Sequence, residues 1–177
     1  MRNLVERLLA AAKVKTPPVP VDDLIRAQGV EITRKKFDDE TSGLVYVDPK
    51  TGLAVIGLNV SHSKTRQRFT LAHELGHFLL HNRGAGGLHV DEGDFFVRFR
   101  DRHSADGFDK EEREANAFAA ELLMPSCFLE RDIKKLTDGL SLSDDADVRR
   151  LANRYGVSLQ ALSIRLAKIG LLDAGVL

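Results

Sequence analysis

Apolar residues recur at helical spacing in two long segments of the chain, and both segments also carry side chains that can bind metals. Residues 61–82 begin with serines and threonines suited to cap a helix and contain no proline. Residues 109–125 are acidic in their first turns, as the helix dipole favours, and end at Pro125. The pattern therefore predicts two long helices, the first of which carries the sequence "RFTLAHELGHFLLH".

Shorter elements are predicted before the first long helix. Residues 3–13 have apolar positions at helical spacing and stop at the proline-rich "TPPVP", and a second short helix over residues 21–29 is closed by Gly29. Apolar runs rich in β-branched residues predict three strands, over residues 30–36, 42–48 and 53–59. The last two strands flank the turn "PKTG", which predicts a β-hairpin.

The second half of the chain is less regular. The connection over residues 83–110 is Gly-rich and charged, contains "DFFVRFR" as a candidate short strand, and has a length that is more often functional than idle. A weaker helix over residues 127–136 and a polar linker follow. The tail, residues 148–172, is predicted to form two helices broken at "YGVS", with Ser158 as the second N-cap.

These elements predict an α+β protein, in which a small mixed or antiparallel sheet packs against the first long helix and further helices lie at the C-terminus. The length of 177 residues suits one globular domain with a helical appendage. We expect residues 1–136 to form the main domain and residues 137–177 a helix-turn-helix-like extension packed on it.

Composition excludes several classes of protein. The 26 basic and 26 acidic residues are interspersed, so no large electrostatic surface for nucleic acid is expected. Cys127 is the only cysteine, which excludes an internal disulfide, a Cys-rich zinc finger and an iron–sulfur cluster. No apolar run reaches membrane-spanning length, and we expect a cytoplasmic protein whose metal ligands are His, Asp or Glu.

The first long helix carries the H-E-x-x-H pattern at His73, Glu74 and His77. Positions i and i+4 of a helix lie on one face, so both imidazoles can meet one metal ion. Glu74 follows the first ligand directly and is placed to take a proton from the water that the metal activates. Gly76, costly within a helix, would let another backbone approach closely. A catalytic zinc site has three protein ligands, so this pair needs a third.

The second long helix offers three carboxylates for that position, Glu111, Glu112 and Glu114. Spacing alone does not choose among them. Glu114 lies beside the apolar stripe of the helix, whereas Glu112 falls nearer the solvent side. We therefore expect Glu114 to be the ligand, and Glu111 and Glu112 to be solvated residues that complement the helix dipole.

Together, "RFTLAHELGHFLLH" and "EREANAFAAELLMP" closely resemble the ImmA/IrrE family of bacterial and phage metallopeptidases, over roughly residues 20–130. The resemblance implies a zincin-like fold with Zn²⁺, or alternatively Mn²⁺, held by His73, His77 and Glu114, and with Glu74 as catalytic base. The "GAGGLH" portion of the connection departs from the family pattern, so substrate access or regulation is expected to differ.

Members of that family are associated with proteolytic inactivation of a helix-turn-helix repressor, often encoded nearby, which switches on a phage, mobile-element or stress-response programme. The resemblance thus implies a zinc metallo-endopeptidase that cleaves a specific cytoplasmic regulator, above all an Xre-type helix-turn-helix repressor. One alternative is a non-proteolytic regulator that binds a repressor or DNA, with the metal as a structural element. Another is an enzyme restrained until it is activated. A structural zinc site, however, needs four protein ligands and leaves Glu74 without a function.

Several residues are secondary candidates. His81, His89, His103 and Tyr46 are possible donors to the oxyanion that forms during attack, although each is more often an ordinary surface or core residue. The strand over residues 53–59 is the candidate edge for pairing with a substrate strand. The C-terminal helix pair has helix-turn-helix spacing and nearby basic residues, but its charge is not concentrated, so packing is favoured over DNA binding. The basic residues are Arg149, Arg150, Arg154, Arg165 and Lys168.

Overall fold

The computed structural model describes residues 1–38, 40–81, 87–92, 107–136 and 145–171. The chain divides into two compact units. The sheet unit is Pro20–Ala119, and the helical unit combines Met1–Val19 with Ala120–Leu177. The predicted boundary between residues 136 and 137 borders a segment outside the described residues and stays a prediction.

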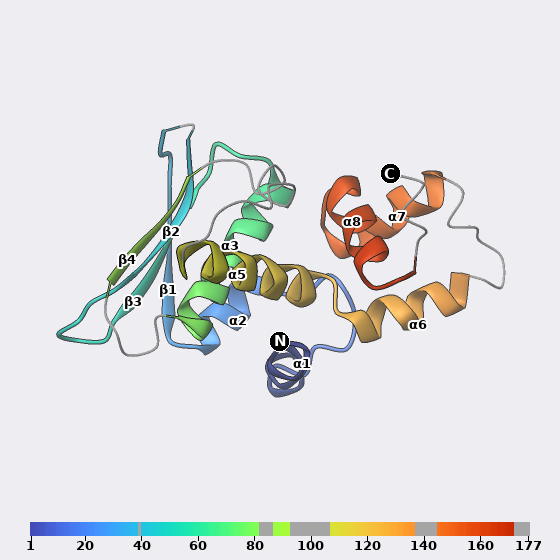
Figure 1. Cartoon of the computed structure of the whole chain (residues 1–177), viewed down its shortest axis with the longest axis horizontal. Helices are drawn as coiled ribbons and strands as arrows, with labels where there is room; N and C mark the ends of the chain where they lie inside the picture. The colour runs from blue at the N-terminus through green and yellow to red at the C-terminus, as the bar shows by residue number, and fades with distance from the viewer. Residues whose placement is uncertain (39, 82–86, 93–106, 137–144, 172–177) are drawn as a thin grey trace. The chain divides into compact units, whose positions relative to one another are not determined.

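The sheet unit contains four strands in the order β1-β3-β2-β4 (Figure 1). Strand β1 (Val30–Lys35) pairs parallel with β3 (Ala54–Asn59), and β2 (Thr41–Val47) pairs antiparallel with both β3 and β4 (Gly87–Glu92). The mixed sheet and the β2–β3 hairpin are as predicted. Strand β3, however, is hydrogen-bonded on both sides, so the expectation that residues 53–59 form a free edge for a substrate is wrong.

Three helices belong to this unit in whole or in part: α2 (Val21–Ala27), the predicted long helix α3 (Lys64–Leu80) and the start of α5 (Gly107–Leu123). Helix α3 packs on β2 and β3 (Figure 1). Alternation along the strands explains this contact, because Val45 and Ile56, both fully buried, are paired across the sheet. On the opposite face Tyr46 and Leu88 are paired and exposed.

A fully buried asparagine fixes where α3 begins. The Asn59 amide nitrogen donates to the carbonyl oxygens of Asp38 (2.8 Å) and Thr41 (2.7 Å), and its amide oxygen accepts from Ser61 N (3.0 Å). Ser63 then caps α3, since its hydroxyl accepts from the backbone N–H of Arg66. The start of the helix is thereby tied to the loops at the end of the sheet.

The helical unit contains α1 (Arg2–Ala11), the end of α5, α6 (Ser126–Leu136), α7 (Asp145–Tyr155) and α8 (Leu159–Lys168). Ser158 caps α8, as predicted, by accepting from Ala161 N. The side chain of Arg165 pairs with Glu121 and donates to the Met124 carbonyl, and the Tyr155 hydroxyl donates to Asp132 at 3.0 Å. These contacts join the C-terminal helices to α5 and α6.

The connection between α3 and α5 was predicted to contain one short strand. The candidate strand "DFFVRFR" lies outside the described residues. Strand β4 was not predicted, because its residues lie in the Gly-rich connection.

None of the described helices combines the length and apolar character that a membrane span requires.

Candidate metal centre

Helix α3 presents its two motif imidazoles side by side. His73 and His77 lie one turn apart, are 0% and 1% exposed, and have their Nε2 atoms 3.0 Å from each other. Because α3 packs into the sheet unit on this face, both rings are withdrawn from solvent. The expected convergence of the pair is therefore present.

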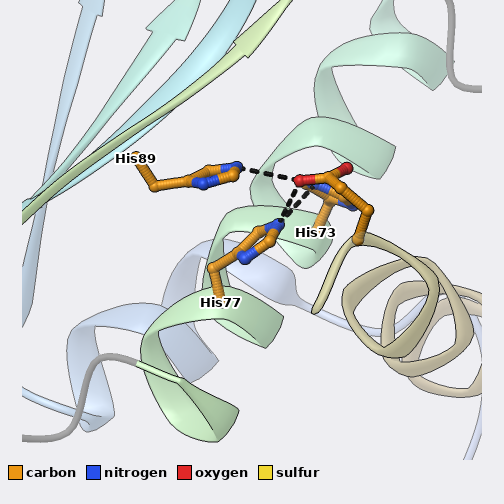
Figure 2. A group of neighbouring side chains, drawn as sticks. His73, His77 and His89 are labelled. Atoms are coloured by element: carbon orange, nitrogen blue, oxygen red, sulfur yellow. Dashed lines mark hydrogen bonds and ion pairs between the residues drawn. The ribbon is translucent and has the colours of Figure 1, made fainter. Parts of the chain in front are cut away.

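A third imidazole comes from the sheet. In the β2–β4 register His89 lies opposite Val45, whose buried side chain faces α3, so alternation directs His89 to the same face. Its ring stacks on that of His77, with centroids 3.7 Å apart. Figure 2 shows the three rings converging, His73 and His77 from α3 and His89 from β4.

The carboxylate that joins them is Glu112 of α5. Its Oε1 atom lies 3.0 Å from His77 Nε2 and 3.1 Å from His89 Nε2, and its Oε2 atom lies 3.5 Å from His73 Nε2. Glu112 is 5% exposed. The expectation that it faces solvent is therefore wrong.

Glu114, the predicted ligand, lies outside this group. Its carboxylate is 3.7 Å from His81 Nε2 and 3.8 Å from Lys110 Nζ, and the side chain is 40% exposed. The difference follows from the phase of α5: Glu112, Ala115, Asn116 and Ala119 occupy i, i+3, i+4 and i+7, and all four are buried. The sequence contained this signal, since the apolar residues Ala115 and Ala119 lie one and two turns after Glu112.

Gly76 explains how α5 comes close enough. A Cβ atom at this position would lie 3.1 Å from Ala115 Cα and 3.1 Å from Phe118 Cδ1. The backbones of α3 and α5 thus approach at Gly76, as the sequence led us to expect, and Glu112 lies one turn before that contact. The glycine of the motif places the carboxylate against the histidines.

The donor set fits a divalent metal ion. The ligand atoms of His73, His77, His89 and Glu112 all lie within 4.8 Å of one another. Two nitrogens bound to one tetrahedral zinc at about 2.0–2.1 Å are about 3.4 Å apart, close to the 3.0 Å between His73 and His77. Imidazoles with one carboxylate suit several divalent transition metals, zinc among them.

Asn116 orients the first of these ligands. Its side-chain oxygen lies 3.1 Å from His73 Nδ1 and accepts a hydrogen bond from that nitrogen. A proton held on Nδ1 leaves the Nε2 lone pair facing the other donors, which is the tautomer that a metal requires. Sequence reasoning did not assign Asn116 a role, although it lies one turn after Glu112 on the same helix face.

The protonation states of the clustered side chains also favour binding of a metal cation. Burial lowers the pKa of His73 to about 3 and lowers the pKa of His77 as well. Burial alone would raise the pKa of Glu112, but its hydrogen bonds with His77 and His89 outweigh burial and lower that pKa. Near neutral pH His73 and His77 are therefore neutral and Glu112 is ionised, the forms that bind metals.

Glu74 is fully buried beside the cluster and is not one of its four donors. It faces β2 at Gly43, where an added Cβ would lie 3.4 Å from Glu74 Oε1 and only 2.4 Å from Thr70 Cγ2. The absence of a side chain at Gly43 thus lets this part of α3 approach the sheet. Such a position agrees with the predicted distinction between the metal ligands and the base.

The other candidates are dispersed. Tyr46 is 40% exposed on the far face of the sheet, and His103 lies outside the described residues. His81 lies against Glu114 rather than in the cluster. Cys127 is a half-buried free thiol. Of the proposed oxyanion donors that the structure describes, only His89 reaches the cluster.

Comparison with known proteins identifies the family. Residues 25–167 match the IrrE N-terminal-like domain, which defines a family of peptidases. No curated protein matches the chain. Among solved structures, a protein described as "Mycobacterium tuberculosis transcriptional regulator" has a similar fold, with a TM-score of 0.61 and 17% identity over 94% of this chain. This chain spans 46% of that protein, and the likeness concerns the fold alone. The family match covers most of the sequence and confirms the resemblance seen in its motifs: the chain belongs to the IrrE N-terminal-like family of peptidases.

Proposed function

We propose that the protein is a zinc-dependent endopeptidase, with His73, His77 and Glu112 as metal ligands and Glu74 as the catalytic base. The observation that carries the proposal is the convergence of these ligands in a buried site beside a second buried carboxylate. Membership of a peptidase family supports the same reaction class. Mn²⁺ is the alternative metal.

Each residue has a definite task in peptide hydrolysis. When bound, the metal supplies Lewis-acid activation of water and of the peptide carbonyl. Glu74 accepts the proton of the attacking water at a carboxylate oxygen and returns it to the leaving amine nitrogen. Asn116 holds His73 in the tautomer whose Nε2 faces the site. Burial of the cluster excludes bulk water and strengthens these interactions.

The substrate we propose is a cytoplasmic helix-turn-helix repressor, of the Xre type, encoded near this protein. Support comes from the resemblance of the two motif helices to ImmA/IrrE peptidases, whose members are associated with such repressors. The structural neighbour named a transcriptional regulator points to the same biological setting. Cleavage of the repressor would then change transcription without contact between the peptidase and DNA.

Direct DNA binding by the C-terminal helices is less well supported. Arg165 is largely buried in its ion pair with Glu121, and Arg154 lies 3.3 Å from Asp132. Arg150 lies 3.6 Å from Asp147. Guanidinium groups already paired with carboxylates contribute less to phosphate binding, which depends on concentrated free charge.

A second function is favoured by one specific observation. His89 makes a fourth protein donor, and four protein ligands are characteristic of structural zinc. On this basis the protein would be a non-proteolytic regulator that binds a repressor or DNA. The role of Glu74 separates the two functions, because a structural site requires no base.

The test uses the purified protein, loaded with zinc, and the repressor encoded nearest to it. We expect cleavage that a chelator abolishes, and its loss in Glu74→Gln with zinc still bound at the wild-type ratio. The matched control is Glu111→Gln, which removes an exposed carboxylate from α5 and should cleave normally. Full biological activity of Glu74→Gln would exclude the peptidase and favour the regulator.

A further inference from the structure

The fourth donor is at odds with catalysis, since a catalytic zinc site keeps one position open for water. We propose that His89 is a displaceable fourth ligand, which closes the metal site in the resting protein and leaves it when the enzyme becomes active. This inference rests on the proposed function and concerns the regulation of the same site.

His89 is placed as a ligand and not merely as a neighbour. Its Nε2 atom is 3.1 Å from Glu112 Oε1, almost as close as that of His77 at 3.0 Å. Both imidazoles thus meet the same carboxylate oxygen, and the His89 ring stacks on that of His77. The Nε2 atom of His89 converges with those of His73 and His77, and all four donors lie within 4.8 Å (Figure 2).

The other three donors are held by long helices packed against each other. His73 and His77 occupy adjacent turns of the 17-residue α3, and Glu112 lies on the 17-residue α5. The contact of Gly76 with Ala115 and Phe118, both fully buried, fixes α5 to α3. Moving any of these ligands would disturb buried packing between helices.

His89 is held more weakly. Strand β4 has six residues and, among the described strands, pairs only with β2, where the register is interrupted between Thr41 and Gly43. Its residue Leu88 is 63% exposed, so the outer face of β4 contributes little apolar burial. Segments with few buried contacts open at lower free energy than packed helices. His89 is therefore the ligand that can leave.

Displacement of His89 would convert the site from four protein ligands to three. The proposed base for a water bound in place of His89 is Glu74, whose carboxylate is buried but is not one of the four donors. A single residue on β4 would thus determine whether the buried base has a water to deprotonate. Pairing of a substrate or partner with β4 is one way to draw the residue out.

Cobalt spectroscopy tests this ligation without reference to cleavage. The full chain is loaded with Co²⁺, and its visible absorption is followed during titration with azide. For wild type we expect a tetrahedral spectrum that azide does not change. For His89→Ala and for His89→Gln we expect a spectrum that azide shifts. Metal affinity should fall by about 10-fold, less than for the loss of a ligand on a packed helix, because part of the binding free energy of His89 is spent on ordering its strand. Leu88→Ala, altered on the exposed face of the same strand, should behave as wild type.

Two results would overturn the proposal: a wild-type cobalt spectrum that responds to azide as the His89 variants do, or loss of cleavage in both His89 variants while wild type remains active. Thermal unfolding of the variants shows whether they are folded. If neither wild type nor variants cleave the repressor but the azide response appears only in the variants, ligation by His89 stands and the proposed peptidase function fails. Faster cleavage by the variants than by wild type would support both.

Discussion

Replacing Glu112 by Gln tests whether Glu112 or Glu114 is the third metal ligand. The change keeps the size of the side chain but removes the charge that lies between 3.0 and 3.5 Å from three imidazole nitrogens. Glu114→Gln is the matched control, because it makes the same chemical change two residues away on the same helix. The sequence had favoured Glu114, whereas the structure favours Glu112.

The expected loss of zinc affinity differs widely between the two variants. Apparent binding free energies of structural zinc sites are about 10–16 kcal/mol, so one ligand of four accounts for about 3 kcal/mol, or about 100-fold in affinity. Glu112, at 5% exposure, has little water to replace the lost contact. Glu114 is 40% exposed and pairs only at 3.7–3.8 Å with His81 and Lys110, a type of contact worth at most about 1 kcal/mol. Its replacement should change zinc affinity by less than about 3-fold.

Competition with a chromophoric chelator measures both affinities under identical conditions. Each variant is checked for a wild-type circular dichroism spectrum before titration, so that loss of affinity is not confused with loss of structure. Wild-type affinity in Glu112→Gln together with a large loss in Glu114→Gln would refute the assignment of the third ligand. It would also refute the argument that the Gly76 contact fixes the phase of α5.

Three further predictions concern residues around the site. Asn116→Ala should weaken zinc binding by about 10–100-fold in the same chelator assay, because His73 loses its orienting acceptor, while Asn116→Asp should retain most of the affinity. Gly43→Ala should lower the free energy of unfolding in urea by about 1–3 kcal/mol, since its Cβ would lie 2.4 Å from Thr70 Cγ2, and Thr70→Ser in the same chain should restore part of that loss. His73 alone should lower the stability of the metal-free protein by about 2 kcal/mol between pH 7.5 and pH 5. Its pKa is 6.5 in the unfolded state and about 3 in the folded state, so only the unfolded state takes up a proton in this range. Calorimetry should show a smaller dependence of stability on pH in His73→Leu.

The helices and the β2–β3 hairpin could be predicted because their signals are local. The caps Ser63 and Ser158 lie next to the helices that they start, and the turn between β2 and β3 lies between its two strands. The spacing of His73 and His77 is also local, since one helix carries both. For these features, periodicity and turn chemistry are sufficient for a prediction.

The rest of the site depends on contacts between distant segments. Whether Glu112 or Glu114 faces α3 depends on the rotation of α5, which the contact between Gly76 and Ala115 sets. His89 reaches the cluster through pairing of β4 with β2, and the Gly-rich sequence before β4 gave no strand signal. The family resemblance implied that the third ligand is a glutamate on this helix. It assigned that role to Glu114, whereas the structure brings Glu112 to the histidines.

Glu74 is the residue that decides between a catalytic and a structural metal. Burying a carboxylate costs free energy even where it is hydrogen-bonded, and Glu74 is fully buried. The four-donor cluster does not include it, so binding of the metal by those four residues does not explain why this carboxylate, next to His73 in the sequence, is buried. The packing around it is specific as well, because Gly43 lacks the side chain that would lie 3.4 Å from the Glu74 carboxylate. A base that acts once His89 withdraws accounts for the burial of Glu74, for its place beside the ligands and for the fourth donor together.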